Sequence, residues 1–351
     1  MNDLTDRQKN LLMLLVRDYI ETAQPVSSLH LVGRYHLDMS SATIRNEMSA
    51  LTEMGYLRQP HTSAGRIPSE DGYRYFVSHM IEQAELPEAV QNTISHQFHQ
   101  SRPDVEQWMT LAASVLAHQS QAVSLVTAPH AEKSRFKHVE LISTQGRQVL
   151  MVLVMWGGEV SQQVLSLAEP VSQERLSGAA RRINSACQGR TTDETISQLT
   201  HADALETDIL TLVLQEMRRA DDRASGNLYY DGLSNVLSEP EFNASDPQGT
   251  RDARRALRLF DERSTLQELL SQTVLNTGLG SVQVLIGGEG TWEELRQCSM
   301  VLARYGVAGH VTGMLGVMGP MRMSYGKTIP TVRFVANLLS DLVNDSFVEN
   351  G

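Results

Sequence analysis

The sequence predicts an α+β protein that is built from several domains and contains antiparallel sheets. Apolar residues recur at helical spacing through the first 80 residues, where a turn-rich loop then separates two short strand-like segments. From Phe136 onward, strand-like runs alternate with tight turns. The chain has 351 residues, of which 41% are hydrophobic, and this length suits two or three domains with cores of their own.

The composition argues against several classes of protein. The longest unbroken apolar run, Val149–Trp156, is far shorter than the roughly 20 residues that a membrane-spanning helix needs. The first residues are acidic and polar, which is not typical of a secretory signal. Cys187 and Cys298 lie far apart in the chain, so they favour neither a disulfide framework nor a cysteine-based metal site. We therefore expect a soluble, cytoplasmic protein.

The formal net charge of −11 is unfavourable for nucleic-acid binding, because DNA repels acidic surfaces. The charge is unevenly distributed, however. Residues 1–80 carry eight Arg or Lys and nine Asp or Glu, so nearly all of the excess negative charge lies after residue 80. Within Gly55–Arg66 there are two arginines, one histidine and no acidic residue. One short segment of an acidic molecule is therefore locally cationic.

The start of the chain is predicted to be helical. Thr5 and Gln8 have the spacing of a capping box, which marks the beginning of a first helix. A second helix is expected after a cap at Ser27 or Ser28. Apolar residues at helical spacing give both helices a side that faces a core.

A third helix follows after a short turn. It is predicted to begin near Ser40 and to end at Gly55, because glycine readily adopts the left-handed conformation that closes a helix. Beyond it, Tyr56–Gln59 and Arg66–Pro68 can pair across a turn-rich loop, before a closing helix. Helices joined by a short turn and followed by a two-stranded wing are typical of a winged helix-turn-helix, which we predict for residues 1–80.

The rest of the chain is predicted to be one α/β domain that is interrupted by an insertion. Residues 81–103 are polar and indicate a linker that contains a helix. The discontinuous domain comprises residues 104–190 and 250–345 and contains an antiparallel sheet. Residues 191–249 resemble long polar helices and are assigned to an inserted, mostly helical domain. The predicted strands are Phe136–Ser143, Gln148–Trp156, Glu159–Leu167, Val282–Ile286, Ser299–Tyr305 and Met314–Met318.

The third helix has two faces of different chemistry. At about 100° per residue, Ile44, Met48 and Leu51 fall on one stripe and are predicted to face the core. The opposite side is small, polar and cationic, with Ala42, Arg45, Asn46 and Ser49. A guanidinium and a carboxamide can hydrogen bond to guanine and adenine edges in a major groove. In an isolated helix such a face is commonly only solvated, but the preceding helix, the short turn and the wing favour DNA binding.

The wing supplies a second group of candidate contacts. Arginines and hydroxyls suit phosphate oxygens, and a wing arginine can also enter a minor groove. The alternative is a plain hairpin whose arginines pair with surface carboxylates. The candidate wing residues are Arg58, His61, Thr62, Ser63 and Arg66. Hydroxyl residues at the start of the third helix complete the predicted DNA contacts, namely Ser40, Ser41 and Thr43.

Several segments of the chain resemble the HrcA family of bacterial heat-inducible transcription repressors. The resemblance extends over most of the chain, and its combination of motifs is specific. The segments are Pro25–Ser28, Ser40–Met48, Pro60–Pro68, Gly72–Tyr75, Leu237–Phe242, Leu285–Glu289 and Gly316–Tyr325. The family often has a basic residue after its Pro-Val-Gly-Ser motif, and this chain departs from it with Ser27-Ser28-Leu29-His30.

The resemblance implies a homodimer with three parts in each chain, namely a winged helix, a GAF-like domain and a dimerisation domain inserted into it. It implies binding of double-stranded DNA at an inverted-repeat operator, the CIRCE element, before chaperone operons. It also implies that a GroEL-type chaperonin favours the binding-competent repressor. Repression then falls when misfolded protein occupies the chaperonin.

Other functions are less well supported by the sequence. His96 and His99 are three residues apart, but no nearby carboxylate or cysteine completes a metal site. The segments Gly278–Gly280 and Gly287–Gly290 suit tight turns better than a phosphate-binding fingerprint, and no Gly-x-Ser-x-Gly elbow frames a nucleophile. We expect no enzyme, metal or cofactor. The alternative function is a winged-helix regulator that senses a small molecule in its GAF-like domain, by analogy of fold.

Overall fold

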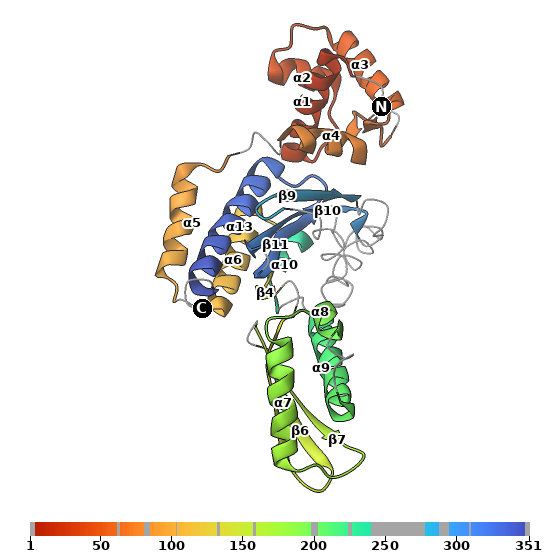
Figure 1. Cartoon of the computed structure of the whole chain (residues 1–351). Coiled ribbons are helices and arrows are strands. Elements are labelled where there is room, and N and C mark those ends of the chain that lie inside the picture. The colour runs from red at the N-terminus through yellow and green to blue at the C-terminus, as the bar shows by residue number, and fades with distance from the viewer. Residues whose placement is uncertain are drawn as a thin grey trace. The chain divides into compact units, whose positions relative to one another are not determined.

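The computed structural model describes residues 4–61, 64–80, 85–102, 104–131, 134–156, 159–197, 203–223, 227–239, 278–287, 295–308 and 310–347. The fold mixes helices with antiparallel sheets (Figure 1). The chain divides into two compact units. Unit 1 comprises residues 1–127, 228–305 and 314–342, and unit 2 comprises residues 128–227, 306–313 and 343–351.

The first part of unit 1, residues 4–80, is called the N-terminal module. It contains α1 (Asp6–Thr22), α2 (Ser28–Tyr35), α3 (Ser41–Glu53), β1 (Leu57–Arg58), β2 (Ile67–Pro68) and α4 (Glu70–Met80). Strands β1 and β2 pair antiparallel. Aliphatic side chains from the first three helices form the buried core, namely Leu11, Leu12, Leu15, Val16, Leu31, Ile44, Met48 and Leu51. The predicted order of helices, hairpin and closing helix is confirmed.

Local hydrogen bonds determine where these helices begin and end. Thr5 and Gln8 form the predicted capping box, in which each side chain accepts from the other's backbone N–H. Ser27 and Ser40 cap α2 and α3, and each accepts a hydrogen bond from the backbone N–H three residues further on. Gly55 closes α3 with a φ of +88°. The helix signals in the sequence therefore act as predicted.

The remainder of unit 1 is a sheet with helices packed on it. Its helices are α5 (Glu88–Gln100), α6 (Val105–Ser120), α10 (Leu233–Leu237) and α13 (Tyr325–Phe347), and its strands are β3 (Val123–Thr127), β8 (Leu228–Asp231), β9 (Val282–Ile286), β10 (Cys298–Val307) and β11 (Val311–Pro320). The strand order is β8-β3-β11-β10-β9, and the first residues of β11, which belong to unit 2, pair there with β4 (His130–Ala131). The β3–β8, β3–β11 and β9–β10 pairs run antiparallel.

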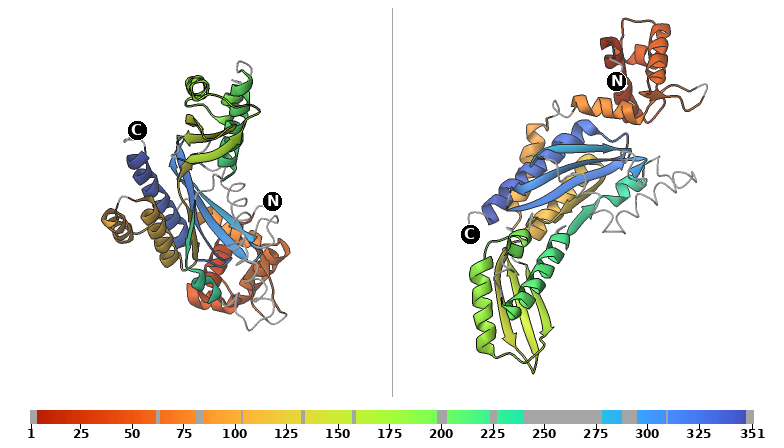
Figure 2. Two further views of the ribbon diagram at one scale, coloured as in Figure 1. Left: turned by 90° about the horizontal axis from the view of Figure 1, so that it is seen from below. Right: turned by 45° about the vertical axis from the view of Figure 1, so that its right-hand side comes forward.

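Helices α6 and α13 cover one face of this sheet, and α5 packs against α6 (Figure 2). On the other face, residues of β3, β9, β10 and β11 form a buried cluster with Val236 of α10. Every residue of β3 is buried, because both faces of the strand are covered. This explains why the strand lacks the alternation of polar and apolar residues that a half-exposed strand has.

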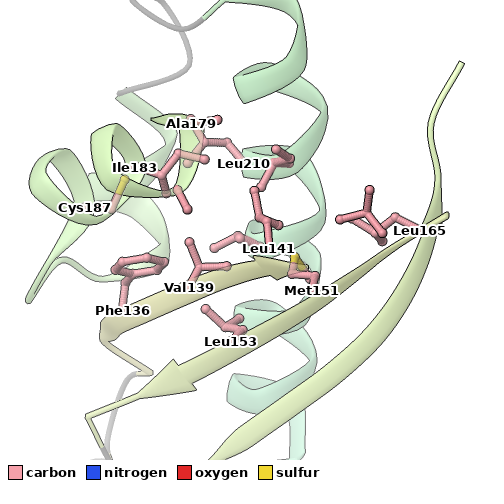
Figure 3. Close-up of a cluster of buried hydrophobic side chains, with 14 of the residues drawn as sticks. Phe136, Val139, Leu141, Met151, Leu153, Leu165, Ala179, Ile183, Cys187 and Leu210 are labelled. Carbon is pink, nitrogen blue, oxygen red and sulfur yellow. The ribbon is translucent and has the colours of Figure 1, made fainter. Parts of the chain in front are cut away.

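Unit 2 is built on a three-stranded antiparallel meander. It contains β5 (Phe136–Ser143), β6 (Gln148–Met155), β7 (Val160–Ser166), α7 (Gln173–Cys187), α8 (Thr192–Ile196) and α9 (Ala204–Arg223). The inner face of the sheet packs on α7 and α9. Figure 3 shows Val139, Leu141 and Met151 of the sheet facing Ile183 of α7 and Leu210 of α9, all of them buried. The predicted strands of this meander agree with the structure to within one or two residues.

The outer edge of β5 is occupied by amide side chains from α7. Asn184 accepts from the backbone N–H of Val139 through Oδ1 at 2.8 Å and donates to the Val139 carbonyl through Nδ2 at 3.1 Å. Gln173 does the same for two neighbouring residues, because it accepts from Ser143 N at 2.7 Å and donates to Leu141 O at 2.8 Å. These side chains take the place of a fourth strand.

The division into units differs from the predicted domain boundaries. The sequence predicts that the meander belongs with residues 250–345 and that the insertion is limited to residues 191–249, whereas residues 128–227 form one compact unit. The reason is α9, which has a polar composition but carries a buried stripe that includes Ile209, Val213 and Met217. Because this stripe packs on the meander and α7, the strands and the long helix form one core. Residues 240–277 lie outside the described residues.

No helix in the described part of the chain is long and apolar enough to cross a membrane.

Candidate nucleic-acid interface

Helix α3 is held in the N-terminal module by one face and is solvent-exposed on the other. Ile44 and Leu51 are fully buried and Met48 is 4% exposed, while Arg45 and Asn46 are exposed. The buried stripe packs against α1 and α2. The polar face of α3 (Ala42, Arg45, Asn46 and Ser49) therefore points away from the core, as its spacing predicts.

The connection between α2 and α3 is short and has a defined conformation. His36 ends α2 in the left-handed region with a φ of +49°, and Ser40 begins α3 four residues later. A non-glycine residue at positive φ is uncommon and is kept only where the surrounding structure fixes it. The turn therefore sets the angle between the two helices and, with it, the direction of the polar face of α3.

Hydroxyl groups on α3 are used to hold the helix itself. The Ser40 side chain accepts from the backbone N–H of Thr43 at 3.1 Å, and its Oγ lies 2.9 Å from the Thr43 Oγ1. Ser49 donates to the Arg45 carbonyl at 3.0 Å. Ser41 is half-buried at the first position of the helix. Of the predicted α3 contacts, Arg45 and Asn46 are thus the long side chains that extend into solvent.

Arg66 connects the hairpin to α3 and to the loop before α2. Its backbone N–H donates to the Val26 carbonyl at 2.8 Å, and its carbonyl accepts from the Val26 N–H at 2.9 Å. Its Nε donates to the Thr52 hydroxyl of α3 at 3.0 Å. The preceding Gly65 permits this approach, since a Cβ there would lie 2.3 Å from the Val26 carbonyl oxygen. The side chain is therefore anchored beside α3.

The other wing residues lie near the tip of the hairpin. Arg58 on β1 and His61 in the loop are both exposed. Gln59 donates from Nε2 to the Ala64 carbonyl at 3.2 Å, which closes the loop. Two predicted contacts, Thr62 and Ser63, lie outside the described residues.

Two polar clusters in the N-terminal module were not found from the sequence. Glu47 of α3 lies 3.5 Å from Arg7 and accepts from Gln8 at 3.1 Å, so the carboxylate is paired with α1. Asp18 is 1% exposed and accepts from Arg34 at 2.7 Å. His30 of α2 has its Nε2 3.1 Å from the Asp18 Oδ1.

These clusters orient α2 and α3 on α1, because a buried carboxylate is stable only where it is paired and hydrogen-bonded. Arg34 also donates to Glu21, and this hydrogen bond raises the pKa of the guanidinium above its ordinary value. The partners of Asp18 lie 12 and 16 positions away, so no short spacing in the sequence marks them.

The described residues contain no cluster of three or more His, Cys, Asp or Glu that could hold a metal ion. Within α5, His99 bonds to the Ser95 carbonyl at 2.7 Å through Nδ1, and the His96 Nε2 lies 3.5 Å from the Gln100 Nε2. In unit 2, a polar cavity of about 580 Å³ lies beside β7 and α9, where Glu216 accepts from Ser161 at 2.7 Å.

Comparison with known proteins places the chain in a family. A family model described as the HrcA protein C terminal domain matches residues 106–329. The heat-inducible transcription repressor HrcA of Roseiflexus castenholzii is 40% identical over 353 residues, which cover 98% of this chain and 96% of that protein. The protein of the same name from Chloroflexus aurantiacus is 40% identical over 364 residues, covering 99% and 96%.

A crystal structure described as that of a hypothetical protein superposes with a TM-score of 0.62 at 26% identity, and it covers 98% of this chain and 99% of that chain. The likeness to proteins of known sequence and structure thus extends over nearly the whole chain, including the N-terminal module that carries the polar face of α3. The chain belongs to the HrcA family, whose named members are heat-inducible transcription repressors.

Proposed function

We propose that the N-terminal module is a winged helix-turn-helix that binds operator DNA, with α3 as the recognition helix and the β1–β2 hairpin as the wing. The observation that carries this proposal is the exposure of Arg45 and Asn46 opposite the buried stripe of α3. A helix held by one face can enter a major groove with the other, where these two side chains match the edges of guanine and adenine.

The remaining predicted contacts have a positioning role in this proposal. Arg58, His61 and Arg66 of the hairpin suit phosphate oxygens, which fix the register of a protein on a duplex but carry no sequence information. The hydroxyls of Ser40, Ser41, Thr43 and Ser49, at the start of α3 or one turn after Arg45, are proposed as further phosphate contacts. Thr62 and Ser63 are kept as candidate wing contacts on sequence grounds.

We propose that the chain acts as a homodimer on an inverted-repeat operator of the CIRCE type, before chaperone genes. One N-terminal module contains too few cations for tight binding, so two linked copies are needed to raise the effective concentration of the second. The half-site centres are then expected to be a whole number of helical turns apart, about 34 Å each. Membership of the HrcA family supports a GAF-like assignment for the unit 1 sheet and modulation by a GroEL-type chaperonin.

The outer face of the meander in unit 2 is our proposed dimer contact. Ile142, Leu150 and Val164 lie side by side across β5, β6 and β7, and Val154 lies beside Val160. Ile142, Val160 and Val164 are 45%, 57% and 59% exposed. Exposed apolar rows of this kind, which here flank the row Glu140–Val152–Gln162, mark protein–protein contacts on soluble proteins. This location extends the predicted dimerisation segment to include the meander on which α9 packs.

Replacing both Val160 and Val164 by lysine is expected to convert the dimer to a monomer, because charges on the apolar face would be desolvated in the contact. The sedimentation coefficient of the full chain measures the result. Gln215→Lys adds a charge to the exposed side of α9 and is the control. A double variant that sediments like the parent protein excludes this face as the dimer contact.

Replacing Arg66 by alanine is expected to weaken binding to all DNA sequences alike, because a phosphate contact is lost. The slope of the logarithm of the affinity against the logarithm of the salt concentration is expected to become shallower by about one. Titrations at several salt concentrations measure the slope. Thr52→Val removes the anchor of the guanidinium but keeps its charge, so it is expected to leave the slope unchanged. An unchanged slope in the alanine variant removes Arg66 from the contact surface.

The function itself is tested by a footprint on the chaperone promoters of the source organism, with and without chaperonin. Protection of an inverted repeat that increases with chaperonin is the expected result. If no promoter sequence is protected under either condition, the proposed operator binding is contradicted. If protection is the same with and without chaperonin, the proposed modulation by the chaperonin is contradicted.

A further inference from the structure

Three segments that are far apart in the sequence meet beside α4. They are the first turns of α4, the end of β9 at Ile286-Gly287, and Tyr325 at the start of α13. All three belong to unit 1, and Figure 1 shows α4 next to β9. The contact joins the N-terminal module to the sheet that follows it in the chain.

Arg74 provides the polar part of this contact. Its guanidinium donates to Asp71 at 2.7 Å and to Glu70 at 3.2 Å, both on α4. The same Nη2 donates across to the Ile286 carbonyl, at the end of β9, at 3.3 Å. The two carboxylates therefore orient the guanidinium toward the Ile286 carbonyl, which lies outside the N-terminal module. The side chain is 35% exposed, so the contact lies at the surface.

Gly287 allows the two segments to approach closely. It has a φ of +64°, a conformation that glycine adopts without strain. A Cβ at this position would lie 2.7 Å from Cδ and 2.9 Å from Oε1 of Glu70. The carboxylate that accepts from Arg74 thus lies directly against the glycine, and a side chain would push it away.

Tyr73 provides the apolar part of the contact. Its ring centroid lies 6.4 Å from that of Tyr325, at an interplanar angle of 54°, and the two residues are 2% and 0% exposed. The Tyr325 hydroxyl lies 2.7 Å from both the Ser299 Oγ of β10 and the Met321 carbonyl, so this ring is fixed to the sheet. Tyr73 packs on a rigid partner.

We propose that Arg74, Tyr73 and Gly287 form a releasable latch between the N-terminal module and the sheet of unit 1, and that the closed latch is the state that binds both half-sites of an operator. The contact is small, and half-exposed ion pairs contribute little stability, so opening is readily reversible. A closed latch restricts the orientation of each recognition helix before DNA is bound, which lowers the entropic cost of engaging the second half-site. This inference rests on the proposed function.

The latch is tested in the full chain with Arg74→Lys and Gly287→Ala. The first keeps the charge but loses the planar guanidinium that joins Glu70, Asp71 and the Ile286 carbonyl. The second places a Cβ against the Glu70 carboxylate. Gly33→Ala is the matched control, because no atom lies within 4 Å of the Cβ added at Gly33.

The first measurement does not need DNA. A fluorophore on Asp6→Cys, whose native side chain is 97% exposed, reports the tumbling of the module, since Cys187 and Cys298 are both buried. Time-resolved anisotropy is expected to show an added fast component in both latch variants but not in Gly33→Ala. Anisotropy decays that are the same in the latch variants and the parent overturn the proposal.

The second measurement compares a full inverted repeat with a single half-site. In both variants the affinity for the full repeat is expected to fall about tenfold, while the half-site affinity stays within about twofold. The double variant is expected to lose no more than either single variant, because both act on one contact. An equal loss on both DNAs overturns the latch. If the parent protein binds neither DNA, the proposed function fails, and the anisotropy alone decides whether the latch exists.

Discussion

Replacing Arg45 by alanine is expected to weaken operator binding by about 1–3 kcal/mol per subunit and to relax the preference for one base pair in each half-site. The side chain is exposed on α3, opposite Ile44, Met48 and Leu51, so its loss removes a contact without opening the core. Because a dimer loses the contact in both half-sites, the combined effect is about twice as large. Titration against the operator and its single-base variants measures both quantities.

Arg45→Lys separates the two roles of this residue. Lysine retains the positive charge but lacks the planar pair of donors that a guanine edge accepts, so base discrimination is expected to fall while non-specific binding is retained. The thermal unfolding of both variants is expected to match that of the parent, which excludes a folding defect. Full operator affinity and selectivity in Arg45→Ala would show that another element recognises the bases.

Replacing Gly65 by alanine is expected to destabilise the N-terminal module by about 1–3 kcal/mol, as overpacking does elsewhere. The new Cβ would lie 2.3 Å from the Val26 carbonyl oxygen and 2.9 Å from that of Pro25, and both are backbone atoms that do not move aside by a change of rotamer. The two hydrogen bonds between Val26 and Arg66 are then lengthened or broken, so the hairpin separates from the loop before α2.

Hydrogen exchange localises this effect better than a melting temperature, because the chain has more than one compact unit. The backbone amides of Val26 and Arg66 are expected to lose protection against hydrogen exchange in Gly65→Ala. The backbone amides of the meander in unit 2 are expected to keep their protection. Gly33→Ala is the control, since α2 gains an alanine in open space and is expected to be more stable by up to about 1 kcal/mol. Unchanged protection at Val26 and Arg66 would contradict the proposed role of Gly65.

Much of the N-terminal module follows from short-range signals that a sequence displays. The capping residues Thr5, Ser27 and Ser40 and the terminating Gly55 each act within a few positions, and the apolar stripe of α3 depends only on helical period. The exposure of Arg45 and Asn46 follows from that stripe. The strands of the meander were similarly predictable, because their strand-like runs are separated by tight-turn residues.

The features that were missed depend on contacts between distant residues. Asp18 and Arg34 are separated by 16 positions, and nothing near either residue indicates that the carboxylate is buried. The anchoring of Arg66 by Thr52 also joins separate elements. The apolar stripe of α9 was outweighed by the polar composition of the surrounding segment, so the packing of α9 on the meander was not predicted. Local patterns thus predict elements, whereas long-range partners determine which elements share a core.

The amide groups that Asn184 and Gln173 extend along β5 have a consequence for how copies of this protein assemble. A sheet that is free at both margins can recruit neighbours without limit, and such growth leads to fibres. With the β5 margin already satisfied from within the same chain, any incoming strand must join beside β7. Strand addition to the meander is therefore confined to one side, so this sheet cannot extend in both directions.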